Sequence, residues 1–153
     1  MKAKRLFFVL LLIVIFAGCS LNGKQEATLN SAKMAYLEAR NNNKVALLVK
    51  LTYPDAVRYY QNKGDDAFKE RFKPENNQAF FRSGIVKQVE SNGEVIHVQF
   101  EFERITETEF DIIAEPALVY AISADNGKHW KFLDKVEYDN PEILPGNKKL
   151  ITD

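Results

Sequence analysis

The segment VIHVQFEFER, residues 95–104, decides the fold. Its apolar and polar side chains alternate, which is the two-residue period of a β-strand. The apolar set is Ile96, Val98, Phe100 and Phe102, and the polar set is His97, Gln99, Glu101 and Glu103. One face of such a strand is buried and the other is solvated, as is common in antiparallel sheets. The segment therefore predicts an antiparallel sheet with its core on the apolar side and with His97 on the solvated side.

Turn residues on both sides of this segment predict a meander of four strands. The turns are expected at residues 91–94, 106–109 and 125–128. The strands are expected at residues 81–89, 96–103, 110–124 and 129–137. Pro116 lies inside the third strand, where a proline marks a bulge, a bend or an edge position.

Helices are predicted before the sheet, from apolar residues at helical spacing. They are expected at residues 26–40, 45–53 and 54–60, and from Asp65 or Asp66 to about Lys73. Asn41, Asn42 and Asn43 end the first helix, because asparagine competes with the helix by bonding its own backbone. Helices followed by a meander predict an α+β fold, with N-terminal helices packed on a curved antiparallel four-stranded sheet. This domain is expected over residues 26–138, between a tether at 19–25 and a surface tail at 139–153.

The first 18 residues have the pattern of a secretory signal. Lys2, Lys4 and Arg5 form a positive start, and the apolar run from Leu6 to Phe16 follows it. A helix of that length rises roughly 16 Å, about half of a hydrocarbon core. The run is therefore too short to span a bilayer comfortably, and it ends in small residues, as secretory signals do.

The end of this signal, Phe16-Ala17-Gly18-Cys19, resembles the lipobox of bacterial lipoproteins, although Phe16 stands where leucine is usual. In that family the signal is cut before the cysteine, and the sulfur receives diacylglycerol. Cys19 is the only cysteine of the chain, so no intramolecular disulfide can form. The resemblance implies lipid attachment at Cys19, a membrane anchor and a place in the bacterial cell envelope, on the periplasmic or outer-membrane side. The alternative is a plain secretory signal or an anchor helix with an incidental cysteine.

The order of the elements resembles the nuclear-transport-factor-2-like fold, a cystatin-like α+β roll. The segment 35–39, followed by residues 45–54, is similar to the paired opening helices of small bacterial members. The resemblance implies a cone between the sheet and the helices, where isomerases and dehydratases of this fold keep acid–base residues. The possible pocket residues are Tyr36, Tyr53, Tyr60, Phe100, Phe102 and Tyr120. The candidates for an acid–base pocket are the following residues: Tyr36, Tyr53, Asp55, Tyr59, Tyr60, Asp111 and Tyr120.

One short motif is specific. Ser123-x-Asp125-x-Gly127-x-x-Trp130 matches the Asp box of sialidases and related propellers at each fixed position. Asp125 is expected to accept backbone N–H bonds across the turn, Gly127 to supply a positive φ, and Trp130 to fold back under the hairpin. The box occurs once, and the chain is too short for a propeller, so the motif predicts a structural hairpin turn.

Composition excludes some functions and leaves three hypotheses. The formal net charge is zero, and without residues 1–18, which hold three basic residues and no acid, the chain is three charges more negative. Nucleic-acid binding is therefore not expected. No catalytic, metal or cofactor residue is assigned. The first hypothesis is a lipid-anchored, non-enzymatic domain that binds a small apolar ligand or a partner protein. The alternatives are a small isomerase- or dehydratase-like enzyme and an accessory subunit of an envelope assembly.

Overall fold

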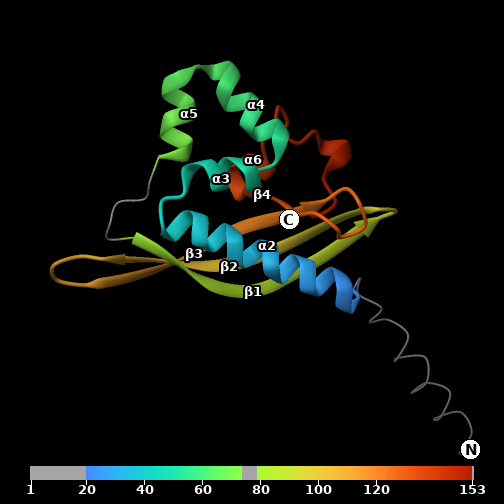
Figure 1. The fold of residues 1–153 in the computed structure, drawn as a ribbon, viewed down its shortest axis with the longest axis horizontal. Coiled ribbons are helices and arrows are strands. Elements are labelled where there is room, and N and C mark those ends of the chain that lie inside the picture. Colours follow the sequence, from blue (N-terminus) through green and yellow to red (C-terminus); the bar gives the residue numbers. More distant parts are fainter. Residues whose placement is uncertain (1–19, 74–78, 153) are drawn as a thin grey trace, which may run out of the picture.

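The computed structural model describes residues 20–73 and 79–152, and it confirms the α+β fold class (Figure 1). The predicted signal and Cys19 lie outside the described residues. The helices are α2 (Gly23–Asn41), α3 (Val45–Leu51), α4 (Pro54–Lys63), α5 (Asp65–Phe72) and the short α6 (Lys135–Tyr138), with a 3-10 turn, η1 (Gly146–Lys148). The strands are β1 (Ala79–Asn92), β2 (Val95–Glu107), β3 (Ile112–Ser123) and β4 (Lys131–Asp134). They form one antiparallel four-stranded sheet in sequence order.

Helix α2 begins earlier than the sequence pattern predicts. The backbone N–H groups of Lys24 and Gln25 donate to the side chain of Asn22, and Gln25 accepts from the Asn22 N–H in return. This reciprocal pair is a capping box, which satisfies N–H groups that a helix start leaves unpaired. Residues 23–25 are therefore helical, and the expected tether at 19–25 is wrong at its end.

The inner core fills the space between α2 and the sheet. It is formed by the alternating apolar positions of β2 together with α2, β3 and β4. Its fully buried members include Tyr36, Val98, Phe100, Phe102 and Phe132. Val98, Phe100 and Phe102 are positions that the two-residue period of residues 95–104 predicts to be buried.

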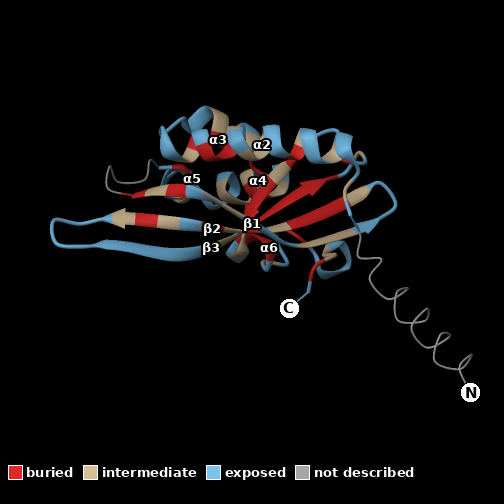
Figure 2. Cartoon of the chain, turned by 90° about the horizontal axis from the view of Figure 1, so that it is seen from below, coloured by how far each residue is buried: buried red, intermediate tan, exposed pale blue. Residues whose placement is uncertain are grey.

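A second core covers the other face of the sheet, where the sequence predicts solvent. Ile143, Leu144 and Ile151 of the expected surface tail pack with Tyr120 and Leu133. Figure 2 shows helices α2 and α3 on one side of the sheet and α6 and the C-terminal end on the other. The tail is therefore part of the packed domain, because its apolar residues bury the outward face of β3 and β4.

The last two strands differ from the prediction in length. β4 stops at Asp134, and the chain turns into α6 instead of continuing as a strand to residue 137. β4 pairs with β3 only over Val119–Ile122, so the first half of β3 has no paired strand on that side among the described residues. Pro116 lies in this half, which is the edge position that a proline tolerates. The β2–β3 hairpin then projects beyond the helices (Figures 1 and 2).

Candidate functional site

Three of the predicted pocket residues lie together, but they pack on one another. The Tyr36 ring stacks on Phe132 at 4.5 Å and lies 6.4 Å from the ring of Phe102. Phe102 in turn lies 5.6 Å from Phe100, with the two rings nearly parallel. All of these side chains are buried. The space between Tyr36, Phe102 and Phe132 is thus occupied by their own rings, while Phe100 also lines a mostly apolar pocket of about 440 Å³ together with Leu29, Val86 and Val89.

The other three predicted pocket residues are not brought to this stack. Tyr120 lies on the opposite face of the sheet, where its ring stacks on Tyr138 at 3.8 Å. Tyr53 packs against that second core, and Tyr60 lies half-buried with its ring edge toward Phe72. The side-chain alternation of β3 separates Tyr120 from the inner core, since it shares a face with Gln99, which donates to its hydroxyl.

Titratable groups from four elements of the fold meet in one cluster. The Arg71 guanidinium lies 2.5 Å and 3.0 Å from the two oxygens of Glu137 and 3.4 Å from Asp134. Arg40 lies 3.6 Å from Asp134, and the Tyr36 hydroxyl donates to the same carboxylate at 3.1 Å. This cluster joins α2, α5, β4 and α6, and its two cations balance its two anions.

The charges of this cluster fit a role in holding these elements together better than a role in acid–base catalysis. Burial alone would raise the pKa of Asp134, but the Arg71 and Arg40 guanidiniums hold it below its ordinary value. Burial raises the pKa of Tyr36, and the negative charge of Asp134 raises it further. A general base needs a pKa near the working pH and a free lone pair near the substrate. Asp134 stays ionised and paired, and Tyr36 stays protonated.

A pocket of about 360 Å³ opens beside the cluster. Four cations line it, namely Arg40, Arg71, Lys73 and Arg104. Each has a carboxylate within ion-pair distance: Lys73 lies 2.6 Å from Glu70, and Arg104 lies 3.9 Å from Glu115. The pocket is therefore lined by an ion-pair network.

The Asp-box turn has the geometry that its sequence predicts. Asp125 accepts from the backbone N–H of His129 at 2.9 Å and from the Ser123 hydroxyl at 2.9 Å. Gly127 has φ +80°. Trp130 is buried, and its indole N–H donates to Thr28 of α2 at 3.1 Å. The motif forms a hairpin turn, as expected, and the bond from Trp130 to Thr28 also joins this turn to the start of α2, which the motif does not predict.

His97 is buried, contrary to the solvated position predicted for it. Its side chain is 1% exposed, and Nδ1 lies 2.7 Å from the Tyr138 hydroxyl. The same hydroxyl accepts from the backbone N–H of Ile151, so it links the sheet to the C-terminal segment. Burial lowers the pKa of His97 to about 4. The imidazole is therefore neutral in the folded protein at neutral pH.

This burial predicts a loss of stability in mild acid. Between pH 6.5, its ordinary pKa, and about pH 4, its pKa in the folded protein, His97 binds a proton in the unfolded chain but largely not in the folded one. The free energy of unfolding should fall by about 3 kcal/mol between pH 6.5 and 4 for this group alone. Urea titrations between pH 6.5 and 4 should show that the free energy of unfolding falls less steeply with pH for His97→Gln than for the wild type. An exposed residue without a titratable group gives the control, Asn62→Gln, which should keep the wild-type dependence of stability on pH. Equal slopes in wild type and His97→Gln would contradict the assignment.

The tip of the β2–β3 hairpin carries the most exposed aromatic side chain of the described residues. Phe110 is 92% exposed, and Ile112 and Ile113 beside it are also exposed. The turn is held by paired bonds, since the Thr108 N–H donates to the Asp111 carbonyl at 2.8 Å and the Asp111 N–H donates to the Thr108 hydroxyl at 3.0 Å. The sequence pattern places Phe110 inside a strand, whereas the structure places it in the turn.

Comparisons with protein-family models, curated proteins and solved structures found no match to this chain. In the part of the chain that the structure describes, no helix is both long and apolar enough to cross a bilayer. Nor do three or more His, Cys, Asp or Glu side chains gather into a metal-binding group within residues 20–73 and 79–152.

Proposed function

We propose that this protein is a lipid-anchored protein of the bacterial cell envelope whose α+β domain binds a partner protein. The positions of the apolar side chains support the binding of a partner protein. Tyr36, Phe100 and Phe102, the residues expected to line the pocket, are buried and pack on one another, while Phe110 stands in solvent. An exposed aromatic side chain beside further exposed apolar residues is typical of protein interaction sites.

The alternatives receive less support from the described residues. A small-ligand site needs space among the apolar residues of the cone, and the aromatic stack occupies that position. An acid–base enzyme needs an available carboxylate or histidine. Asp134 and Glu137 each accept from an arginine, and His97 bonds Tyr138 on the far side of the sheet.

The anchor is tested by Cys19→Ala in the full-length chain. Without the sulfur no diacylglycerol can be attached, so the variant should leave the membrane pellet for the soluble fraction or accumulate as the uncut precursor. Acyl chains contribute about 0.8 kcal/mol per buried CH₂, which makes the wild-type attachment effectively complete. Fractionation followed by immunoblotting measures the distribution. A neutral change after the cleavage position, Ser20→Ala, is the control. Unchanged processing and pelleting of Cys19→Ala would count against the anchor.

Partner binding is tested by the mass of the native particle. The lipidated protein, extracted in mild detergent from the cells that make it, should run as a complex larger than the lipidated monomer in multi-angle light scattering. Protein purified after overexpression should give the monomer mass. A monomer in both preparations would contradict partner binding.

A further inference from the structure

We infer that the tip of the β2–β3 hairpin, residues 107–113, is the docking element and that its partner is a different protein with a basic surface around an apolar pocket. This inference rests on the proposed function, because it names the surface and the partner chemistry of the same binding activity. Four observations carry it: the reach of the hairpin, the order of its turn, the exposed Phe110 and the charge around it.

The hairpin reaches away from the body of the domain. β2 and β3 stay paired from Ile96 and Ser123 out to Glu107 and Ile112, with no shift of register. Figure 1 shows the turn at the opposite end of the molecule from the start of α2. Because Cys19 lies just before α2 in the sequence, a chain held to a bilayer there presents its hairpin at the far end of the domain.

The tip presents an aromatic side chain on an ordered turn, so that little conformational entropy is lost when a partner binds. Three hydrogen bonds between Thr108 and Asp111 fix the turn before any partner binds. Phe110 is 92% exposed, and Ile112 and Ile113 extend the apolar surface along the start of β3. An ordered turn loses less conformational freedom on binding than a flexible loop does. A single aromatic side chain inserted into a pocket is a common source of most of the affinity at an interface.

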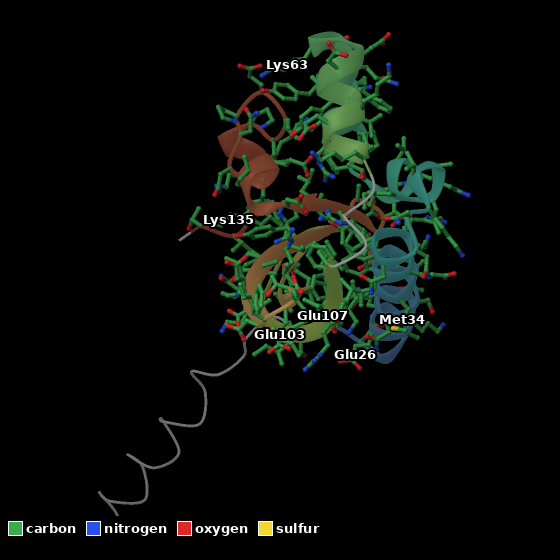
Figure 3. The ribbon with its side chains drawn as sticks, turned by 90° about the vertical axis from the view of Figure 1, so that its left-hand side faces the viewer. Glu26, Met34, Lys63, Glu103, Glu107 and Lys135 are labelled. Atoms are coloured by element: carbon green, nitrogen blue, oxygen red, sulfur yellow. The ribbon has the colours of Figure 1, made fainter. Side chains whose placement is uncertain are left out.

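The charge around the anchor defines the partner. Glu107, Glu109 and Asp111 surround Phe110, and the segment 105–113 contains no lysine or arginine. No ion pair joins these three carboxylates to a cation of the described residues, whereas the carboxylates farther down the hairpin are paired, Glu103 with Arg82 and Glu115 with Arg104. Figure 3, seen from the hairpin side, shows Glu103 and Glu107 well apart from Lys63 and Lys135. Three carboxylates without an ion-pair partner among the described residues fit lysines and arginines around a pocket on the partner.

The same charge argues against two other occupants. Carboxylates beside Phe110 are repelled by an anionic lipid surface, so the tip does not suit insertion into such a bilayer. A symmetric contact between two tips would bring six carboxylates together, since a two-fold interface places the same patch on both copies. The charge of the tip therefore favours binding to a different protein that has a basic surface.

Photocross-linking in intact cells tests the inference. The full-length lipidated protein carries a photoreactive phenylalanine at position 110, and a matched control carries it at Val136, which is 80% exposed on α6. Position 110 should give a cross-linked protein of a new mass that position 136 does not give. The cross-linked partner peptide, mapped by mass spectrometry, should lie in a pocket of apolar residues bordered by lysine or arginine. Reversing the three tip charges, with Glu107→Lys, Glu109→Lys and Asp111→Lys combined, should abolish the product.

Once that partner is purified, titration calorimetry should show roughly 30-fold weaker binding for Phe110→Ala and unchanged binding for Val136→Ala. Circular dichroism of both variants should match the wild type, because both side chains are exposed. The inference is overturned if the product at position 110 is lipid, a dimer of this chain or a protein joined through an acidic surface, or if charge reversal leaves it intact. If other surface positions capture a partner and the tip does not, the inference fails and partner binding stands. If no position captures a protein, both fail.

Discussion

Gly84→Ala is expected to lower the free energy of unfolding by more than ~3 kcal/mol, enough to leave much of the protein unfolded. A Cβ at this position would lie 1.3 Å from the carbonyl oxygen of Glu101 and 2.8 Å from the Cα of Phe102. Both are backbone atoms of the neighbouring strand β2, so no side-chain rotation relieves the clash. Separating β1 from β2 would break the ladder that closes one side of the inner core.

Gly84 also affects the curvature of the sheet. The register of β1 against β2 shifts between Arg82 and Ile85, which is the place of a β-bulge, and a bulge bends its strand and increases its twist. Gly84 lies inside this shift and allows the close approach of the two backbones. The sheet curves around α2 (Figure 1), and the bulge supplies part of that bend.

Urea denaturation followed by the fluorescence of Trp130, the single tryptophan, measures the effect. Gly23→Ala is the matched control, because a Cβ at Gly23 meets nothing within 4 Å. That variant should remain within about 1 kcal/mol of the wild type, with a small gain from helix propensity. A Gly84→Ala protein with the wild-type midpoint would show that β1 and β2 do not approach each other at this place.

Arg71→Met should cost about 3–5 kcal/mol, the second large effect. The side chains of Arg71 and Glu137 are 10% and 2% exposed, and their ion pair is bidentate. Removing the guanidinium leaves Glu137 buried without its counter-charge and deprives Asp134 of a second partner. A lone buried carboxylate is far less stable than a neutral group in the same place.

A second substitution separates the charge from the packing. Arg71→Met combined with Glu137→Gln removes both charges of the pair and should recover a good part of the lost stability, with the coupling read from a double-mutant cycle. The exposed ion pair of Arg58 with Asp55 provides the control, since Arg58→Met should cost less than about 0.5 kcal/mol. If Arg71→Met and Arg58→Met had equal costs, the cluster would not be the tie between α5 and α6 that its geometry indicates.

The face of the sheet that packs on α2 could be predicted from local patterns in the sequence. The alternation in residues 95–104 gives β2 and the buried aromatic residues that face α2. The asparagines after Arg40 end α2 where expected, and Asn43 has the positive φ that asparagine tolerates. The Asp box gives its turn in detail, because every bond within it joins residues close in sequence. The start of α2 was also readable, since Asn22 and Gln25 have the spacing of a capping box.

The outer half and the candidate site depend on contacts between distant residues. His97 is buried because Tyr138 and Ile151 fold over it, and the alternation of β2 alone indicates a solvated face. Arg71 and Glu137 are 66 residues apart, so their pairing has no local sequence signal. Phe110, Ile112 and Ile113 have the composition of a buried strand, and only the projection of the hairpin beyond the helices exposes them.

Mass spectrometry of the N-terminal peptide, from protein of the membrane fraction, tests lipid attachment at Cys19 most directly. A lipoprotein processed at the Phe16–Cys19 motif should yield a mature peptide that begins at Cys19 and carries a diacylglyceryl group on its sulfur. A peptide with a free Cys19 thiol, or one that still contains residues of the Leu6–Gly18 segment, would contradict the proposed anchor.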